Sequence, residues 1–414
     1  MSSPEVAVAG RRTGALEGIR IIDLTMWFQG PVASQLLADL GAEVIHFERP
    51  QGGDLGRGVR SIKALPVSDW NQYFSVINRN KKSVAVDLNK PRGREIMYRL
   101  VERSDVFLSN VTLENLDRWE VTYERLSELN PGLIYVVCTG YGFRGRVTRP
   151  SFDLTVQALT GIMARLGEPG QPPIYVGMGS GDAMGGLMAA VGILLALNAR
   201  RQTGRGQFID ASLYGAQLFL AAPTLQGYLA TGDDFFSKQR SRRDALNPLW
   251  NTYPAQDKWL FVCLENSDQN WRLLCQGLDS PELLRDERFS SAEGRRLSRR
   301  ELVDAIDAIV CQRPAAAWIE RWRPLGIPAS PINNLKDLSE DPQAWENRYL
   351  VTAYCDEVDR EVMVRGLPVS FSKTPAQVRS LGPELGQHTE EVLVDTLGYS
   401  WDDIVEMKSE GVIL

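Results

Sequence analysis

The sequence is poor in histidine, with only His46 and His388 among its 414 residues. A Ser–His–Asp or Cys–His catalytic site therefore has very few ways to be built. Its five cysteines are an odd number and form no CxxC pair and no Cys/His cluster. This pattern argues against a disulfide framework and against a zinc site, and we expect no bound metal. A reducing cytoplasm is the expected compartment.

Several other signals are also missing. The apolar run 183–197 is 15 residues long and contains three glycines, which is short for a membrane span. Residues 1–14 lack a long apolar core and a cleavage pattern, so we expect a loose arm rather than a signal peptide. The net charge of −6 argues against non-specific binding to nucleic acid, though not against a local basic pocket for an anionic cofactor.

What the sequence does contain is an alternation of strand and helix patterns. A β-branched strand signal at 20–24, a helix from Pro31 to about Gly41 and a strand at 43–47 form a βαβ unit. The loop after the first strand has no GxGxxG, so a dinucleotide phosphate turn is not indicated. Further strand signals follow at 83–88, 105–110, 133–139 and 208–213. The alternation predicts a doubly wound parallel sheet.

The composition changes at about residue 231, where a polar, turn-rich stretch precedes a run of helix patterns. We therefore divide the chain into 1–224, a large domain; 225–330, a smaller and mainly helical domain; and 331–414, a linker and the C-terminal part. With 43% hydrophobic residues, the chain can bury a large core.

The stretch 174–206 draws most attention. It predicts a short strand at 174–176, a glycine loop, Asp182 as a helix N-cap, and a fully buried helix that ends before Gly204. Backbone N–H groups and the helix dipole would hold the Asp182 carboxylate ionised. The flanking glycines would let an electrophile approach, and the same N–H groups could receive an oxyanion. Alternatively, Asp182 merely caps the helix.

A second group of candidates is basic. Arg79, Lys81 and Lys82 lie close together before a strand signal. They could form a solvated basic loop or a phosphate-binding patch, and the pattern alone leaves both interpretations open.

Several blocks occur in an order that resembles one family. They are LEGIRIIDLT at 16–25, LLADLGAEVIHFERP at 36–50 followed by GGD, NRNKKSVAVDL at 78–88, NLDR at 115–118, LNPGLIY at 129–135, GILLAL through TGRGQ at 192–207, and GQHTEEVL at 386–393. The set is similar to the class III CoA-transferases, the CaiB/BaiF family. The resemblance covers nearly the whole chain.

The resemblance implies that Asp182 is a nucleophile. It would attack an acyl-CoA thioester and carry CoA as an aspartyl-CoA thioester to a free carboxylic acid, with succinyl-CoA as a possible donor and no prosthetic group. The implied CoA contacts are Arg49, Val86, Asn89, Asn110 and Arg118, and Phe28 stands where some members carry a contacting glutamine, with Gln29 displaced by one position. From pattern alone, the two arginines could instead form surface ion pairs, and Asn110 could be a turn residue.

The same family includes acyl-CoA racemases and isomerases. These use a histidine where this chain has Phe152, which cannot carry a proton, so racemisation is disfavoured. Another alternative is the active subunit of a hetero-oligomeric transferase. The aromatic residues Tyr141, Phe143, Trp250 and Tyr253 hint at an apolar or aromatic acyl group, although they could equally belong to the core.

The resemblance also implies an architecture. We expect an α/β protein with a Rossmann-like large domain built from both ends of the chain and a smaller helical domain, assembled as an interlocked homodimer. The implied partners are an acyl-CoA and a carboxylic acid, with neither nucleic acid nor a membrane.

Overall fold

The computed structural model describes residues 14–63, 66–145, 147 and 149–414. The arm expected at 1–14 lies outside this part of the chain, apart from Gly14. Contacts divide the chain into two compact units. The first comprises Met1–Ile162, Tyr175–Leu225 and Trp345–Leu414, and the second comprises Met163–Ile174 and Gln226–Ala344.

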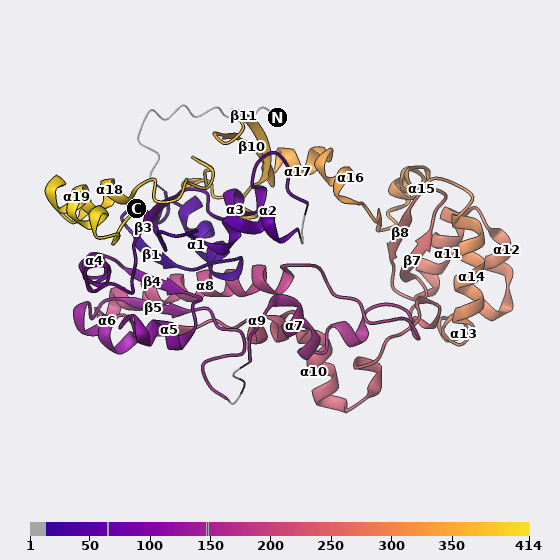
Figure 1. The fold of residues 1–414 in the computed structure, drawn as a ribbon. Helices are drawn as coiled ribbons and strands as arrows, with labels where there is room; N and C mark the ends of the chain where they lie inside the picture. Colours follow the sequence, from indigo (N-terminus) through magenta and orange to yellow (C-terminus); the bar gives the residue numbers. More distant parts are fainter. Residues whose placement is uncertain (1–13, 64–65, 146, 148) are drawn as a thin grey trace. The chain divides into compact units, whose positions relative to one another are not determined.

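The first unit is organised around a six-stranded sheet, and its neighbouring strands all pair in parallel (Figure 1). The spatial order is β3-β2-β1-β4-β5-β6. The strands are β1 (Arg20–Leu24), β2 (Glu43–Glu48), β3 (Lys81–Ala85), β4 (Val106–Ser109), β5 (Ile134–Val137) and β6 (Phe208–Asp210). The predicted parallel sheet is thus confirmed. The strand order reverses between β1 and β4, and ligands of such sheets bind beyond the carboxyl ends of the strands at that point.

Alternate residues of each strand point to opposite faces of the sheet, and apolar residues lie on both faces. Helices therefore cover both faces. Ile21 and Val44 belong to a core shared with α1 (Gln29–Asp39) and α8 (Ser180–Thr203). Ile22 and Ile45 belong to the opposite core, with α4 (Pro91–Val101), α5 (Leu113–Arg118), α6 (Tyr123–Leu129) and α19 (Trp401–Ser409). Helix α1 begins at Gln29, so Pro31 is its third residue rather than its first.

Helix α8 differs from the sequence prediction at its start. Its N-cap is Gly179, with a left-handed φ of 78°, and Asp182 is the third helical residue. The prediction of Asp182 as the N-cap is therefore wrong. The strand expected at 174–176 does not form either, and these residues are irregular and exposed. Gly204 ends the helix in the left-handed conformation, as predicted.

Helix α8 is also buried on one side only. Ala189 and Ile193 are fully buried in the core, whereas Leu195 is 65% exposed. By length and composition α8 could cross a membrane, with 39% of its most apolar window buried. Because its buried face packs tightly on α1, it is a core helix of the first unit. The expectation of complete burial is not met in the single chain.

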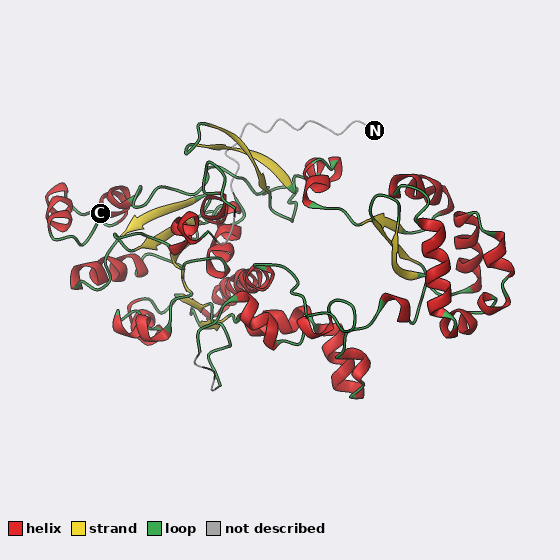
Figure 2. Ribbon diagram, turned by 45° about the vertical axis from the view of Figure 1, so that its right-hand side comes forward, coloured by secondary structure: helices red, strands yellow, loops and turns green. Residues whose placement is uncertain are grey.

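The second unit combines a small antiparallel sheet with helices, which Figure 2 shows in yellow and red. Its strands are β7 (Trp250–Pro254), β8 (Trp259–Cys263) and β9 (Ala329–Pro331), and its longer helices are α11 (Asp268–Leu278), α14 (Arg299–Val310) and α15 (Ala315–Trp322). Trp271, Trp318 and Trp322 fill its core. Tyr253 is also buried there, so it is a core residue.

The remaining helices and strands are shorter or peripheral. They are α2 (Val59–Ile62), α3 (Gln72–Ile77), α7 (Asp153–Leu159), α9 (Leu213–Leu220), α10 (Ala222–Thr231), α12 (Pro281–Arg285), α13 (Ala292–Leu297), α16 (Leu335–Ser339), α17 (Pro342–Glu346), the hairpin of β10 (Leu350–Cys355) and β11 (Arg360–Arg365), and α18 (Thr389–Glu391), which continues into one turn of π-helix at Val392–Thr396.

Candidate active site

Asp182 lines a hollow of about 400 Å³ in the first unit, called here the aspartate hollow. The hollow lies among the loops that follow β1, β4 and β5. It brings together four of the predicted site residues, namely Phe28, Gln29, Asn110 and Asp182. Cys138 and Asp153 also line it. Burial raises the pKa of the Cys138 thiol, which argues against a cysteine nucleophile here.

The Asp182 carboxyl has neither a hydrogen-bond donor nor a cationic partner among the described residues. Burial, together with the neighbouring Asp153 carboxylate, raises the pKa of Asp182 from 3.8 to about 7. The expectation that the helix N-terminus would hold this group firmly ionised is therefore wrong. A partly desolvated carboxylate with this pKa is a stronger nucleophile than an ordinary surface aspartate.

Asp153 occupies the helix N-terminus instead. Its Oδ2 accepts a hydrogen bond from the Gly179 N–H at 2.6 Å, and its Oδ1 accepts one from the Gly181 N–H at 3.0 Å. The side-chain amides of Gln157 and Gln217 also donate to it. Sequence reasoning missed Asp153 because it belongs to α7, and only the tertiary fold brings it to the first turn of α8.

The glycines of α8 have a packing role. A Cβ at Gly181 would lie 2.3 Å from Asp153 Oδ1, and a Cβ at Gly186 would lie 2.5 Å from the carbonyl oxygen of Gln29. These positions therefore let α7 and α1 approach the helix. The idea that they leave space for an electrophile, with free N–H groups for an oxyanion, is not supported at Gly179 and Gly181, whose N–H groups bind Asp153.

A second hollow, of about 310 Å³ and called here the arginine hollow, adjoins the first and shares Met26 and Val111 with it. It is lined by three predicted CoA contacts, Arg49, Asn89 and Arg118. The Arg49 Nε donates to the carbonyl oxygen of Gly53, and the Arg118 guanidinium lies 5.5 Å from the centre of the Trp119 ring. Neither arginine forms an ion pair within the described part of the chain, so both remain available to an anion.

Two further predicted contacts have structural duties. Asn110 accepts from the Met26 N–H at 2.9 Å and donates to the Met26 carbonyl at 2.6 Å, which ties the loop after β1 to the end of β4. Gln29 donates from its side-chain amide to the carbonyl oxygen of Ala211 at 3.0 Å. Val86 lines neither hollow, because its side chain is 2% exposed in the core.

The basic cluster at the start of β3 is neither a solvated loop nor an open phosphate patch. The Arg79 guanidinium is fully buried and forms an ion pair with Asp39 at 2.6 Å. Lys81 is equally buried, with its Nζ 2.9 Å from Asp23. Lys82 bridges Glu43 and Glu391 on the surface. All three cations are therefore neutralised by carboxylates of the same unit.

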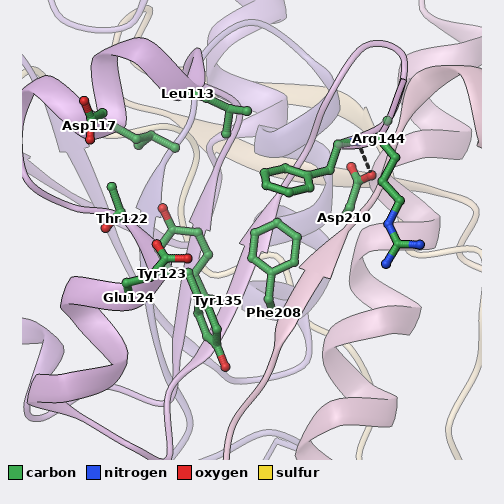
Figure 3. Close-up of a pocket in the computed structure, with 12 residues that line it drawn as sticks. Leu113, Asp117, Thr122, Tyr123, Glu124, Tyr135, Arg144, Phe208 and Asp210 are labelled. Atoms are coloured by element: carbon green, nitrogen blue, oxygen red, sulfur yellow. Dashed lines mark hydrogen bonds between the residues drawn. The ribbon is translucent and has the colours of Figure 1, made fainter. Parts of the chain in front are cut away.

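A third hollow, of about 730 Å³ and called here the aromatic hollow, also adjoins the aspartate hollow. The two share Leu113 and Gly142. Figure 3 shows Tyr135 and Phe208 side by side in its wall, with ring centres 5.9 Å apart. The Phe143 N–H donates to Asp210 Oδ2 at 2.6 Å, which holds the loop over the hollow. Of the four aromatic residues considered for the acyl group, Phe143 lines this hollow and Tyr141 lines the aspartate hollow.

Neither histidine lines these hollows. His46 is fully buried in β2, and His388 accepts a hydrogen bond from the Ser83 N–H. Phe152, at the position considered for a racemase histidine, does line the aspartate hollow. Tyr73 of α3 is a residue that the sequence did not single out. Its ring centre lies 5.8 Å from that of Phe28, and burial with nearby Asp182 and Asp54 raises the pKa of its phenol.

Comparison with known proteins agrees with this geometry. The family model for CoA-transferase family III matches residues 16–389. The chain is 32% identical over 410 residues to the succinyl-CoA–D-citramalate CoA-transferase of Chloroflexus aurantiacus, covering 96% of this chain and 98% of that protein. It is 33% identical over 399 residues to the succinyl-CoA:glutarate CoA-transferase of Mus musculus, covering 96% and 90% of the two chains.

Among solved structures, a CaiB/BaiF family protein from Brucella suis superposes with a TM-score of 0.81 and 29% identity. The match covers 92% of this chain and 99% of that one. The chain therefore belongs to CoA-transferase family III, the CaiB/BaiF family, and is an enzyme of the class that uses CoA thioesters as substrates.

Proposed function

We propose that this enzyme moves CoA from an acyl-CoA to a free carboxylic acid through covalent intermediates on Asp182. The observation that carries the proposal is the placement of Asp182, with a raised pKa, in a hollow that adjoins the one lined by Arg49 and Arg118. None of these three side chains has an ion-pair partner among the described residues. CoA carries several phosphate charges, and arginine binds phosphate well through charge-assisted hydrogen bonds. Arg49 and Arg118 would hold those phosphates.

In the first half-reaction, the Asp182 carboxylate attacks the thioester carbonyl carbon. The carbon–sulfur bond breaks, CoA leaves as a thiolate with the bonding electron pair, and an aspartyl–acyl anhydride forms. The thiolate then attacks the Asp182 carbonyl carbon of the anhydride. This step releases the donor acid as a carboxylate and leaves Asp182 as a CoA thioester.

The second half-reaction reverses these steps with the acceptor. The acceptor carboxylate attacks the aspartyl thioester, forming a new anhydride and releasing the thiolate. The thiolate attacks the acceptor acyl carbon, giving acceptor-CoA and restoring the Asp182 carboxylate. No net proton or electron is consumed. Burial around Asp182 supports the mechanism because water would hydrolyse the anhydride.

Succinyl-CoA is the donor that we propose. Relatives at 32–33% identity are named for succinyl-CoA together with citramalate or glutarate. For the acceptor, the aspartate hollow offers Arg149, the one cation among its described lining residues, which forms no ion pair within the described part of the chain. We assign to Arg149 the attraction of the incoming carboxylate.

The test is to trap the intermediate. The enzyme is incubated with succinyl-CoA alone, treated with borohydride or hydroxylamine, digested and analysed by mass spectrometry. The expected result is a modified Asp182 and no other labelled residue. The Asp182→Asn variant should show no label and no CoA transfer while still binding CoA. A label on another residue, or full turnover by the variant, would refute the mechanism.

We also propose that a second copy of the chain covers the exposed side of α8. Leu187, Val191, Leu194 and Leu195 are all exposed, and their spacing places them along one stripe of the helix. An apolar stripe of this kind is typical of a helix that packs against another helix. A homodimer, interlocked as the resemblance implies, would bury it.

A further inference from the structure

A buried group of charges lies beneath the loop that carries Phe28 and Gln29. His46 is at its centre and is fully buried. Its Nδ1 lies 3.2 Å from Asp23 Oδ2, and its Nε2 lies 3.7 Å from Asp54 Oδ2. These are ion-pair distances, and neither ring nitrogen forms a hydrogen bond with any described residue. The imidazole thus faces one carboxylate at each end.

Counting the surrounding charges indicates its protonation state. Three buried carboxylates face this space: Asp23 on β1, Glu48 on β2 and Asp54 in the following loop. Two cations oppose them. The Lys81 Nζ lies 2.9 Å from Asp23, and the Arg57 guanidinium lies 2.6 Å from Glu48. With all three carboxylates ionised, neutrality requires a third cation, since an uncompensated buried charge is costly. Burial raises the pKa of Asp54, so the alternative is a protonated Asp54 beside a neutral His46.

The other described neighbours of His46 add no charge of their own. Thr25 and Ser34 donate hydroxyl hydrogen bonds to Asp23, and Ser83 donates one to Glu48. The Phe74 ring of α3 faces the imidazole with its centre 6.5 Å away. Tyr73 lies near Asp54, and burial raises the pKa of its phenol, so it stays neutral. Burial alone would lower the pKa of His46, but Asp23, supported by Glu48, raises it.

This group holds the loop at the active site. Asp54 Oδ1 accepts hydrogen bonds from the Trp27 N–H at 3.2 Å and from the Gly56 N–H at 2.7 Å. Trp27 has a left-handed φ of 68°, which is a strained conformation for a bulky residue and needs support from its surroundings. The next two residues, Phe28 and Gln29, line the aspartate hollow.

We propose that His46 is a positioning residue that acts as a buried cation. As an imidazolium between Asp23 and Asp54, it fixes Asp54 and thereby the Trp27 turn that shapes the aspartate hollow. Activity then falls at alkaline pH as His46 loses its proton, because Asp54 loses the cation that holds it. The kinetic part of this inference rests on the proposed transfer reaction, whereas the protonation state of His46 does not.

The protonation state can be measured directly because the chain has only two histidines. The full-length protein labelled with [15N]histidine gives two sets of ring nitrogens, and a His388→Gln variant assigns them. At about pH 8, where a free histidine is neutral, both ring nitrogens of His46 should show imidazolium shifts. His388, whose pKa burial lowers, should be neutral and serves as the internal control. A neutral His46 at that pH, with the proton on Asp54, would overturn the inference.

Kinetics test the positioning role. His46→Gln keeps a polar side chain but removes the cation, and we expect kcat to fall about 10-fold or more because the hollow loses its shape. Asp54 also lines the arginine hollow, so the KM for acyl-CoA is measured alongside kcat and should change less than kcat does. His46→Lys restores a cation and should recover kcat without the alkaline decline. His388→Gln should behave like the unchanged enzyme.

Two outcomes would count against the role. An alkaline decline that is identical in His46→Lys and the unchanged enzyme would assign it to another group. Equal losses in His46→Gln and His46→Lys would show that the imidazole matters only for packing. If His46→Gln fails to fold, the nitrogen shifts and the lysine variant still decide. Absence of CoA transfer in the unchanged enzyme would refute the proposed function instead, and would leave the protonation result standing.

Discussion

The raised pKa of Asp182 depends on which carboxylate occupies the start of α8. Asp153 takes the N–H groups of Gly179 and Gly181, so Asp182 gains little from them. Asp182 instead meets burial and the negative charge of Asp153. A nucleophilic carboxylate must be ionised, and its protonation should therefore limit the reaction at acid pH.

The pH dependence of the rate tests this arrangement. With a pKa of about 7, the ionised fraction of Asp182 rises with pH, and kcat should rise with it and level off above that value, until the alkaline decline proposed for His46 begins. Asp153→Asn removes the neighbouring charge, so the pKa of Asp182 should fall and the acid limb should move to lower pH. Initial rates at saturating substrate check this, with Asp402→Asn on the surface helix α19 as a control. An acid limb that stays in place in Asp153→Asn would contradict the role given to that charge.

The raised pKa of Asp182 should also affect stability, and in the opposite direction: ionisation raises kcat but lowers the free energy of unfolding. Because the folded-state pKa of Asp182 lies above its unfolded value of 3.8, the folded state pays for ionising the group as pH rises. The loss begins above pH 3.8 and is complete above about 7, where it amounts to about 4 kcal/mol at most. Asp182→Asn should therefore be more stable than the unchanged protein at pH 8 and similar at pH 3.8. Urea unfolding at both pH values measures the free energy of unfolding of the two proteins. Equal stability at pH 8 would show that the pKa of Asp182 is not raised in the folded state.

At the scale of elements, α8 connects the active site to the outside of the first unit. One side of the helix packs on α1 and the sheet, its first turn carries Asp182, and its outer side is an apolar stripe. A sequence reading that found the helix apolar on every face was correct about composition. It could not tell that part of this surface remains uncovered in a single chain.

Adding a charge to that stripe tests the proposed dimer. Leu195 is 65% exposed, so Leu195→Glu should leave the folded chain intact while placing a charge in the interface. The expected result is a shift from dimer to monomer in light scattering coupled to gel filtration. Val405→Glu is the matched control, because Val405 is 66% exposed on the separate helix α19. An unchanged dimer in Leu195→Glu, or a monomeric unchanged protein, would refute this interface.

The sequence was informative about elements and less so about their contacts. An apolar β-branched run placed β1 at its observed bounds, and Gly204 marked the end of α8 as expected. The short apolar signal at 174–176 did not correspond to a strand, because no strand forms there. Local pattern could not reveal that Arg79 and Lys81 find buried carboxylates, because their partners lie 40 and 58 residues away.

For the candidate site, too, the sequence identified several residues but not the contacts between them. Ordered blocks pointed to Asp182, Arg49 and Arg118, and the fold brings them into two adjoining hollows. Asp153 could not be found, because its importance lies in hydrogen bonds to residues 26 and 28 positions further on. The pKa of a carboxylate at a helix start depends on such neighbours, so spacing alone did not predict that the pKa of Asp182 is raised.

For the molecule as a whole, the negative net charge contrasts with the positive charge of the two arginines that line the arginine hollow beside Glu48 and Asp54. The chain carries −6 overall, yet its arginine hollow presents Arg49 and Arg118 without an ion-pair partner among the described residues. CoA is strongly anionic. If the overall charge controlled its binding, added salt would screen repulsion and lower the KM for acyl-CoA. If the two arginines control it, added salt would weaken the attraction and raise the KM.

We expect Arg49 and Arg118, rather than the net charge, to control the binding of acyl-CoA. The KM for acyl-CoA should rise with ionic strength, since attraction at a few ångströms exceeds repulsion spread over the whole surface. Arg49→Ala and Arg118→Ala should each raise this KM by about 10-fold and flatten its salt dependence, because each charge-assisted hydrogen bond contributes about 1.5–3 kcal/mol. Arg125→Ala, which removes a surface arginine paired with Glu128 on α6, should do neither. Steady-state kinetics across a salt series decide the matter, because a KM that falls with salt would place CoA away from the arginine hollow.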